Sequence, residues 1–183
     1  GVAVDPTTNT VLVANSQNYG DDSLAVIDGA RQAVVGRIPD VGSNVNADAV
    51  VFDPATRRFY VSAKGGVVLA AVDPRSQAII ASIPSPAGDG GFLAGMAPHL
   101  GTGTLYALDW SGHIYAFDSS SLVLKTTIPL PPAAREGLIS VHPVRHRLYV
   151  THGDGFLVIG ALSGQVEARV PVPVSSVLAH DPR

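Results

Sequence analysis

Three polar residues at equivalent places in a repeated strand have side chains that could do metal chemistry. Asn15, Asp109 and His152 each lie three residues after an aligned Leu or Tyr, and Ala63 fills the fourth such place. Carboxylate and imidazole groups bind divalent ions and activate water or polarise a substrate. If equivalent places form a ring around one axis, Asp109 and His152, together with Asn15, are candidate metal ligands.

A second interpretation of the same residues is structural. Asp and Asn side chains at a turn readily hydrogen-bond the backbone of their own hairpin. A partial ligand set is also poor support for a metal site without geometry. Because Ala63 interrupts the set, we favour the hairpin interpretation and keep the metal site as its alternative.

Three other residues are candidate ligand-binding residues. Trp110, the only Trp of the chain, follows Asp109 in the segment LDWSGH, and with Tyr19 it could stack on the bases of a single-stranded nucleic acid. Asp48 and Glu136 precede the predicted first strands of two repeats. A carboxylate there could bind a cation or a sugar hydroxyl, although rim carboxylates are more often simply solvated.

Motifs of well-known enzyme classes are missing from the sequence. It contains no nucleophile elbow, no His-Glu zinc helix and no dinucleotide-binding fingerprint. His142 and His146 are four residues apart, but Pro143 follows His142 directly and excludes the helix that a zinc hydrolase needs. We therefore expect His142 to take the place of a turn Asp.

All of these residues belong to a repeat that is most complete at residues 47–84. This copy predicts strands at 49–53, 57–63, 67–73 and 78–83, separated by turns. One Pro ends the fourth strand of each copy at intervals of 42 to 45 residues, and another is expected after each first strand. The first set is Pro39, Pro84, Pro129 and Pro171, and the second is Pro6, Pro54, Pro98, Pro143 and Pro182. A period of about 40–50 residues with four strands is typical of a propeller blade.

The third and fourth strands of each copy differ in their hydrophobic pattern. The third is mostly apolar, as in LAVID and HIYAFD, so we expect both of its faces to be covered. The fourth mixes small or polar residues with Val and Ile, as in AIIASIP and VLKTTIP. We expect this strand to lie nearer solvent.

The segments GVAVDP, VLVANS and LAVIDGARQAVVGRIP, with RRFYVS and HRLYVTHGDG, resemble the YVTN family of β-propeller repeats and its exported, YncE-like members. The resemblance implies an all-β fold of four-stranded antiparallel blades, at about 1–45, 46–90, 91–136 and 137–176. Residues 177–183 would begin a further blade. It also implies a single segment of a seven-bladed ring, WD40-like in architecture, in a periplasmic, extracellular or cell-surface protein.

Composition narrows the range of partners. The net charge is −3, from 12 basic and 15 acidic residues, and no Lys/Arg cluster is longer than two residues, so nucleic acid is an unlikely partner. The chain has no Cys, which excludes disulfides and thiolate catalysis. No apolar run of the roughly 18 residues needed for a membrane span is present.

These observations favour a noncatalytic propeller module that binds a protein, glycan or polymer at its loop face, in an exported protein. No cofactor is predicted, apart from a divalent metal if Asp109 and His152 are ligands. The first alternative is a metal-dependent, lactonase-like hydrolase with its site on the same face. The second is a single-stranded nucleic acid binder that uses Trp110 and Tyr19.

Overall fold

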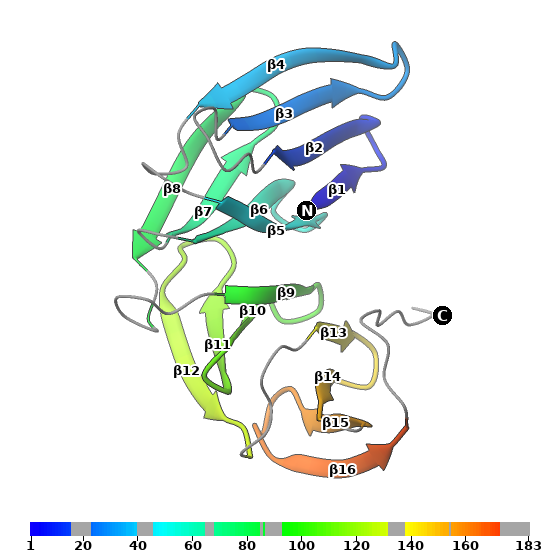
Figure 1. The fold of residues 1–183 in the computed structure, drawn as a ribbon, viewed down its shortest axis with the longest axis vertical. Helices are drawn as coiled ribbons and strands as arrows, with labels where there is room; N and C mark the ends of the chain where they lie inside the picture. Colours follow the sequence, from blue (N-terminus) through cyan, green and yellow to red (C-terminus); the bar gives the residue numbers. More distant parts are fainter. Residues whose placement is uncertain are drawn as a thin grey trace. The chain divides into compact units, whose positions relative to one another are not determined.

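The structure of the chain is a computed structural model that describes residues 1–15, 23–39, 46–64, 68–84, 86, 93–131, 138–153 and 155–172, with the backbone alone at 15, 46–48, 64 and 68. The described residues form four antiparallel sheets of four strands each and no helix (Figure 1). In every sheet the strands are paired in the order of the chain. The prediction of an all-β fold built of four-stranded antiparallel sheets is therefore confirmed.

The strands of the four sheets have the following bounds. The first sheet contains β1 (Val2–Asp5), β2 (Thr10–Asn15), β3 (Ser23–Asp28) and β4 (Ala33–Pro39). The second contains β5 (Asn46–Asp53), β6 (Arg58–Lys64), β7 (Val68–Asp73) and β8 (Ala78–Pro84). The third contains β9 (Leu93–His99), β10 (Thr104–Asp109), β11 (His113–Asp118) and β12 (Leu124–Pro129). The fourth contains β13 (Ile139–His142), β14 (Arg147–His152), β15 (Gly155–Gly160) and β16 (Val166–Pro171).

The second sheet agrees closely with the strands predicted for residues 47–84. β6, β7 and β8 begin and end within one residue of their predicted bounds. β5 begins earlier, at Asn46, and its pairing with β6 shifts register between Ala47 and Val50. An irregularity of this kind adds residues to one strand without a break in the hairpin, which an alternation pattern does not reveal.

The turns after the first and third strands share one backbone geometry. Asp5 and Asp53 accept a hydrogen bond on Oδ1 from the backbone N–H two residues on, from Thr7 and Ala55, both at 2.9 Å. The fourth residue after each strand end has a left-handed backbone, with φ of 54° at Asn9, 56° at Arg57, 58° at Gly103, 51° at His146, 53° at Gln32 and Gln77, 59° at Leu122 and 68° at Gly164. Residues as different as Arg, His and Leu thus adopt the left-handed backbone conformation, which glycine adopts most easily.

The third sheet corrects the alignment of the repeats. Pro98 was expected to follow the first strand of its copy, and this is wrong, because Pro98 lies inside β9 and His99 ends that strand. His99 therefore holds the place of Asp5, Asp53 and His142, which end β1, β5 and β13. A Pro is tolerated within β9 because this strand is at the edge of its sheet, where a backbone N–H needs no ladder partner.

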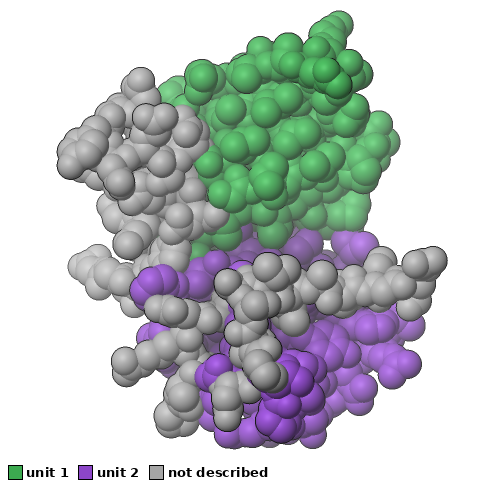
Figure 2. All heavy atoms as spheres, turned by 45° about the vertical axis from the view of Figure 1, so that its right-hand side comes forward, with its two compact units in different colours: residues 1–93 green, residues 94–183 purple. Residues whose placement is uncertain are grey.

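The chain divides into two compact units, residues 1–93 and residues 94–183 (Figure 2). The core of the first unit packs side chains of its two sheets together, and the core of the second unit does the same. The first core includes Leu12, Leu24, Val26, Phe59, Val61 and Val72. The second includes Tyr106, Leu108, Ile114, Leu148, Val150, Leu157 and Ile159. Each unit thus buries the facing surfaces of a pair of sheets.

Burial follows strand position, as the hydrophobic pattern predicts. The four central residues of β11 are buried, whereas five of the six residues of β12 are exposed. β4 is also largely exposed, and its one buried residue is Ile38, just before the terminal Pro. Both predictions for these strands, a covered third strand and a fourth strand near solvent, are confirmed here.

Candidate functional site

The four aligned positions of the second strands are structurally equivalent. Asn15, Ala63, Asp109 and His152 are each the sixth residue of their strand, in β2, β6, β10 and β14. For Asn15 the structure describes only the backbone. The side-chain geometry at this position is therefore described for Ala63, Asp109 and His152.

Asp109 is the acceptor at the centre of the hairpin that joins β10 to β11. Its side chain is completely buried, and Oδ1 accepts the backbone N–H of His113 at 2.7 Å. Oδ2 accepts the Ser111 hydroxyl at 2.5 Å and the Tyr115 hydroxyl at 3.0 Å. Both carboxylate oxygens thus serve the hairpin itself, as the structural interpretation of Asp109 requires.

The donors around Asp109 have defined proton positions. Burial, and after it the Asp109 carboxylate, raises the pKa of Tyr115 to about 12, so that its hydroxyl stays a donor at neutral pH. Ser111 gives its single proton to Asp109, and it therefore accepts from Nδ1 of His113, which lies 2.9 Å from its hydroxyl oxygen. The carboxylate thus fixes the turn through two side-chain hydroxyls and one backbone N–H.

Trp110 lies at the tip of this turn. Its residue surface is 47% exposed, although it directly follows a buried carboxylate. Gly112 completes the turn with a φ of 92°, a backbone conformation that residues other than glycine rarely adopt. The turn therefore presents a large aromatic side chain to solvent on a backbone that Asp109 holds in place.

His152 lies in a different setting at the end of β14. It is partly buried, and its Nε2 atom is buried with no hydrogen-bond partner among the residues that the structure describes. Among the described residues no group of three or more His, Cys, Asp or Glu side chains is close enough to hold a metal ion. The described residues therefore give Asp109 and His152 no third His, Cys, Asp or Glu side chain with which to hold a metal ion.

The remaining predicted residues are placed only in part. Asp48 lies within β5, where the backbone alone is described. Glu136 and Tyr19 lie outside the described residues. The predicted binding roles of these three residues stay predictions.

Sequence reasoning missed a pair of histidines in the second unit. Nε2 of His99 lies 2.9 Å from Nδ1 of His146, and the two rings stack with centroids 5.0 Å apart. The spacing of His142 and His146 drew attention to these residues, but His99 is 47 residues from His146 in the sequence. His142 accepts the backbone N–H of Arg145 at 3.4 Å, so its predicted role as a substitute for a turn Asp is confirmed.

The comparisons with known proteins identify the fold. No protein-family model and no curated protein matches the chain. The structure resembles a WD40 propeller chain in a solved structure titled "Crystal Structure of Mitotic Checkpoint Complex", with a TM-score of 0.75 and 13% sequence identity. The match covers 92% of this chain and 48% of that one, so this chain spans about half the length of its neighbour.

The breadth of the similarity limits what it says about function. Chains of solved structures that match number 1088, and a fold so widely used hosts many unrelated functions. In the described residues no helix is both long and apolar enough to span a membrane. The comparisons therefore show that this chain has a β-propeller-like fold.

Proposed function

We propose that this chain is a noncatalytic β-propeller module that binds a protein partner, with Trp110 as an anchoring residue. The observation that carries the proposal is the hairpin of β10 and β11. It presents a 47% exposed Trp on a turn that the buried Asp109 carboxylate holds by three side-chain and backbone donors.

The physical argument rests on preorganisation. Trp is enriched among the few residues that carry most of the binding energy of protein interfaces, because it offers a large apolar surface with one polar group. A turn that is already ordered loses less conformational entropy when a partner binds. Asp109 thus contributes to binding indirectly, as a positioning residue for Trp110.

The structural neighbour supports the same class of function. Its title describes a complex, the mitotic checkpoint complex, and a propeller chain within an assembly is an analogy for a binding or scaffold role. This support is at the level of the fold. What the partner must recognise is therefore argued from the hairpin itself, which presents the aromatic side chain of Trp110 next to the polar residues Ser111 and His113.

The finer parts of the proposal come from the sequence. The resemblance of segments such as GVAVDP and HRLYVTHGDG to YVTN repeats supports a place among YncE-like propellers. It also supports an exported location, in the periplasm or at the cell surface. The hydrolase alternative is less favoured, because both oxygens of Asp109 already accept hydrogen bonds from the hairpin.

Site-specific photo-crosslinking tests the proposal. A photoreactive phenylalanine analogue replaces Trp110 in one variant of the protein and Leu162 in another, and both are expressed in the native host. Leu162 is a suitable control because it is 71% exposed and lies in a turn of the same unit. We expect a discrete adduct with a specific protein from position 110 and none from position 162.

The affinity of the variants for that protein then measures how much Trp110 contributes to the free energy of binding. Trp110→Ala should weaken binding by about 2–4 kcal/mol, as expected of an interface hot spot. Leu162→Ala should change it by less than about 0.5 kcal/mol. Equal crosslinking from both positions, or full affinity in Trp110→Ala, would contradict the proposal.

A further inference from the structure

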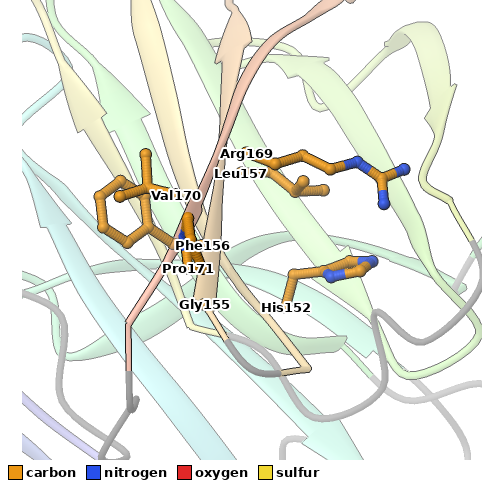
Figure 3. Close-up of a pocket in the computed structure, with 7 residues that line it drawn as sticks. All are labelled: His152, Gly155, Phe156, Leu157, Arg169, Val170 and Pro171. Atoms are coloured by element: carbon orange, nitrogen blue, oxygen red, sulfur yellow. The ribbon is translucent and has the colours of Figure 1, made fainter.

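The fourth sheet carries a hollow of about 250 Å³ at the ends of β14, β15 and β16 (Figure 3). Three of its lining residues, His152, Leu157 and Arg169, come one from each of these strands. None of its lining residues belongs to the hairpin of Trp110, and the proposed function makes no use of it. It combines a cation, a ring nitrogen and an apolar wall.

The strand register places these three side chains on one face of the sheet. Leu157 is paired with Arg169, and His152 is paired with Gly155, two residues before Leu157. Paired residues of antiparallel strands share a face, as do residues two apart on one strand. Figure 3 shows the side chains of His152, Leu157 and Arg169 pointing to one side and those of Phe156 and Val170 to the other.

Gly155 allows β15 and β16 to approach closely at this end of the sheet. A Cβ atom at position 155 would overlap the backbone carbonyl oxygen of Val170 and would also touch Pro171. A larger residue would therefore push β16 away from β15. The absence of a side chain at Gly155 keeps Arg169, on β16, close to the face that carries His152.

The polar groups of the hollow have unused hydrogen-bonding capacity. Among the described residues, Nε2 of His152 is buried and has no hydrogen-bond partner, which is a costly state for a polar atom. Arg169 is exposed, and the residues that the structure describes give it no acidic partner. Glu167, the acidic residue on the same strand, is bound to Arg147 at 2.7 Å. A ligand that accepts hydrogen bonds from both groups would complete them.

We propose that this hollow binds a carboxylate carried by a small aliphatic group, with Arg169 and His152 holding the carboxylate and the apolar residues that line the hollow contacting the aliphatic part. A guanidinium donates two parallel hydrogen bonds to a carboxylate, and a neutral imidazole donates a third from Nε2. The volume is slightly below the range of about 300–1,000 Å³ that is usual for ligand pockets. It therefore suits a group the size of one amino acid.

Isothermal titration calorimetry on the full chain tests the proposal with two probes that differ only in the carboxylate. N-acetyl-leucine should bind with one saturable site, and N-acetyl-leucinamide should bind at least tenfold more weakly. Arg169→Gln and His152→Gln should each weaken N-acetyl-leucine binding at least tenfold. Arg145→Gln is the matched control, because Arg145 is an exposed Arg at the other end of the same sheet, and it should retain the affinity.

A further arm distinguishes the two sources of such a carboxylate. A tetrapeptide with a free C-terminal leucine that binds at least tenfold more tightly than N-acetyl-leucine identifies a polypeptide C-terminus. Equal affinities identify a free small carboxylic acid. Equal binding of the acid and the amide, no saturable binding of the acid, or unchanged affinity in Arg169→Gln would overturn the proposal. Trp110→Ala should leave N-acetyl-leucine binding unchanged, so that this test is independent of the protein-binding hairpin.

Discussion

Two side-chain pairs occupy equivalent places in the two compact units and use different chemistry. In the first unit Arg57 reaches the carboxylate of Asp5, with 3.4 Å between Nη2 and Oδ2. In the second unit His146 lies 2.9 Å from His99. In both, a left-handed turn residue of one sheet meets the residue that ends the first strand of the preceding sheet.

The two pairs differ in charge. Burial alone would raise the pKa of Asp5, but hydrogen bonds from Thr8 and Thr7 and the Arg57 charge outweigh it and lower that pKa. His99 accepts the backbone N–H of Gly101 on Nδ1 at 3.2 Å. Its proton is therefore on Nε2, which donates to Nδ1 of His146. The first pair is ionic at neutral pH, and the second depends on a neutral His99.

The backbone of the fold therefore determines which two positions of neighbouring sheets are in contact. It does not determine which residue types occupy these positions. An acid closes the turn by accepting a backbone N–H, as Asp5 does from Thr7. A neutral imidazole does the same in His99. Equivalent contacts can therefore respond differently to pH and salt, and this difference can be measured.

The largest effect is expected from removal of the buried imidazole. His99 is 1% exposed, and His99→Ala leaves a cavity, an unpaired His146 and an unpaired Gly101 N–H. The free energy of unfolding should fall by about 2–4 kcal/mol, against about 1–2 kcal/mol for Asp5→Ala. Urea denaturation at pH 7.5 measures both.

Leu100→Ala is the matched control for this prediction. Leu100 is the next residue in the same turn and is 46% exposed, so its truncation should cost less than about 0.5 kcal/mol. A cost for His99→Ala no greater than that of Leu100→Ala would show that the histidine pair adds nothing to stability.

A smaller effect is expected from acid. Burial, and then the neighbouring His146, lowers the pKa of His99 below its ordinary value of 6.5. A lowered folded-state pKa means that the unfolded chain binds the proton more readily, so this contribution to stability is complete above pH 6.5 and is lost as the pH falls through the folded-state pKa. The free energy of unfolding should therefore decrease from pH 7.5 to pH 5.

Exchange of the two pairs sharpens this test. The double variant His99→Asp with His146→Arg should lose less stability between pH 7.5 and pH 5 than the natural chain does. The reverse exchange, Asp5→His with Arg57→His, should lose more. If both double variants lose as much free energy of unfolding between pH 7.5 and pH 5 as the natural chain does, the acid response does not come from the histidine pair.

The smallest effect is expected at Arg57. Its side chain is 42% exposed and its contact with Asp5 is long, at 3.4 Å, so Arg57→Ala should cost less than about 1 kcal/mol. The cost should shrink further in 1 M NaCl, where charges are screened within about 3 Å. Thermal unfolding at low and high salt checks this, and a cost that does not change with salt would assign the role of Arg57 to packing.

Much of the fold could be predicted from the residues, because it depends on local patterns. The β-branched and aromatic residues of β6, the apolar run of β11 and the Pro at the end of β8 each specify a strand through neighbouring residues. The third repeat was misaligned because Pro98 imitates the turn Pro of the other copies. Its true turn residue, His99, has no Asp-Pro signature.

The candidate sites depended less on local pattern. The equivalence of Asp109 and His152 followed from the repeat, but their different settings did not. Asp109 is bound by donors from its own hairpin. Nε2 of His152 has no partner in the described part of the chain, and His152 lines a hollow together with Arg169, which is 17 residues away in sequence and two strands away in the sheet.

The sequence by itself determined the repeat and the four-stranded hairpin pattern of each copy, because these depend on the order of neighbouring residues. Only the tertiary structure decided which side chains meet. Packing of sheets joins Asp5 to Arg57 and His99 to His146 across about 50 residues of chain. Such contacts depend on strand register and on the left-handed turn residues, which place a side chain against the neighbouring sheet whatever its type.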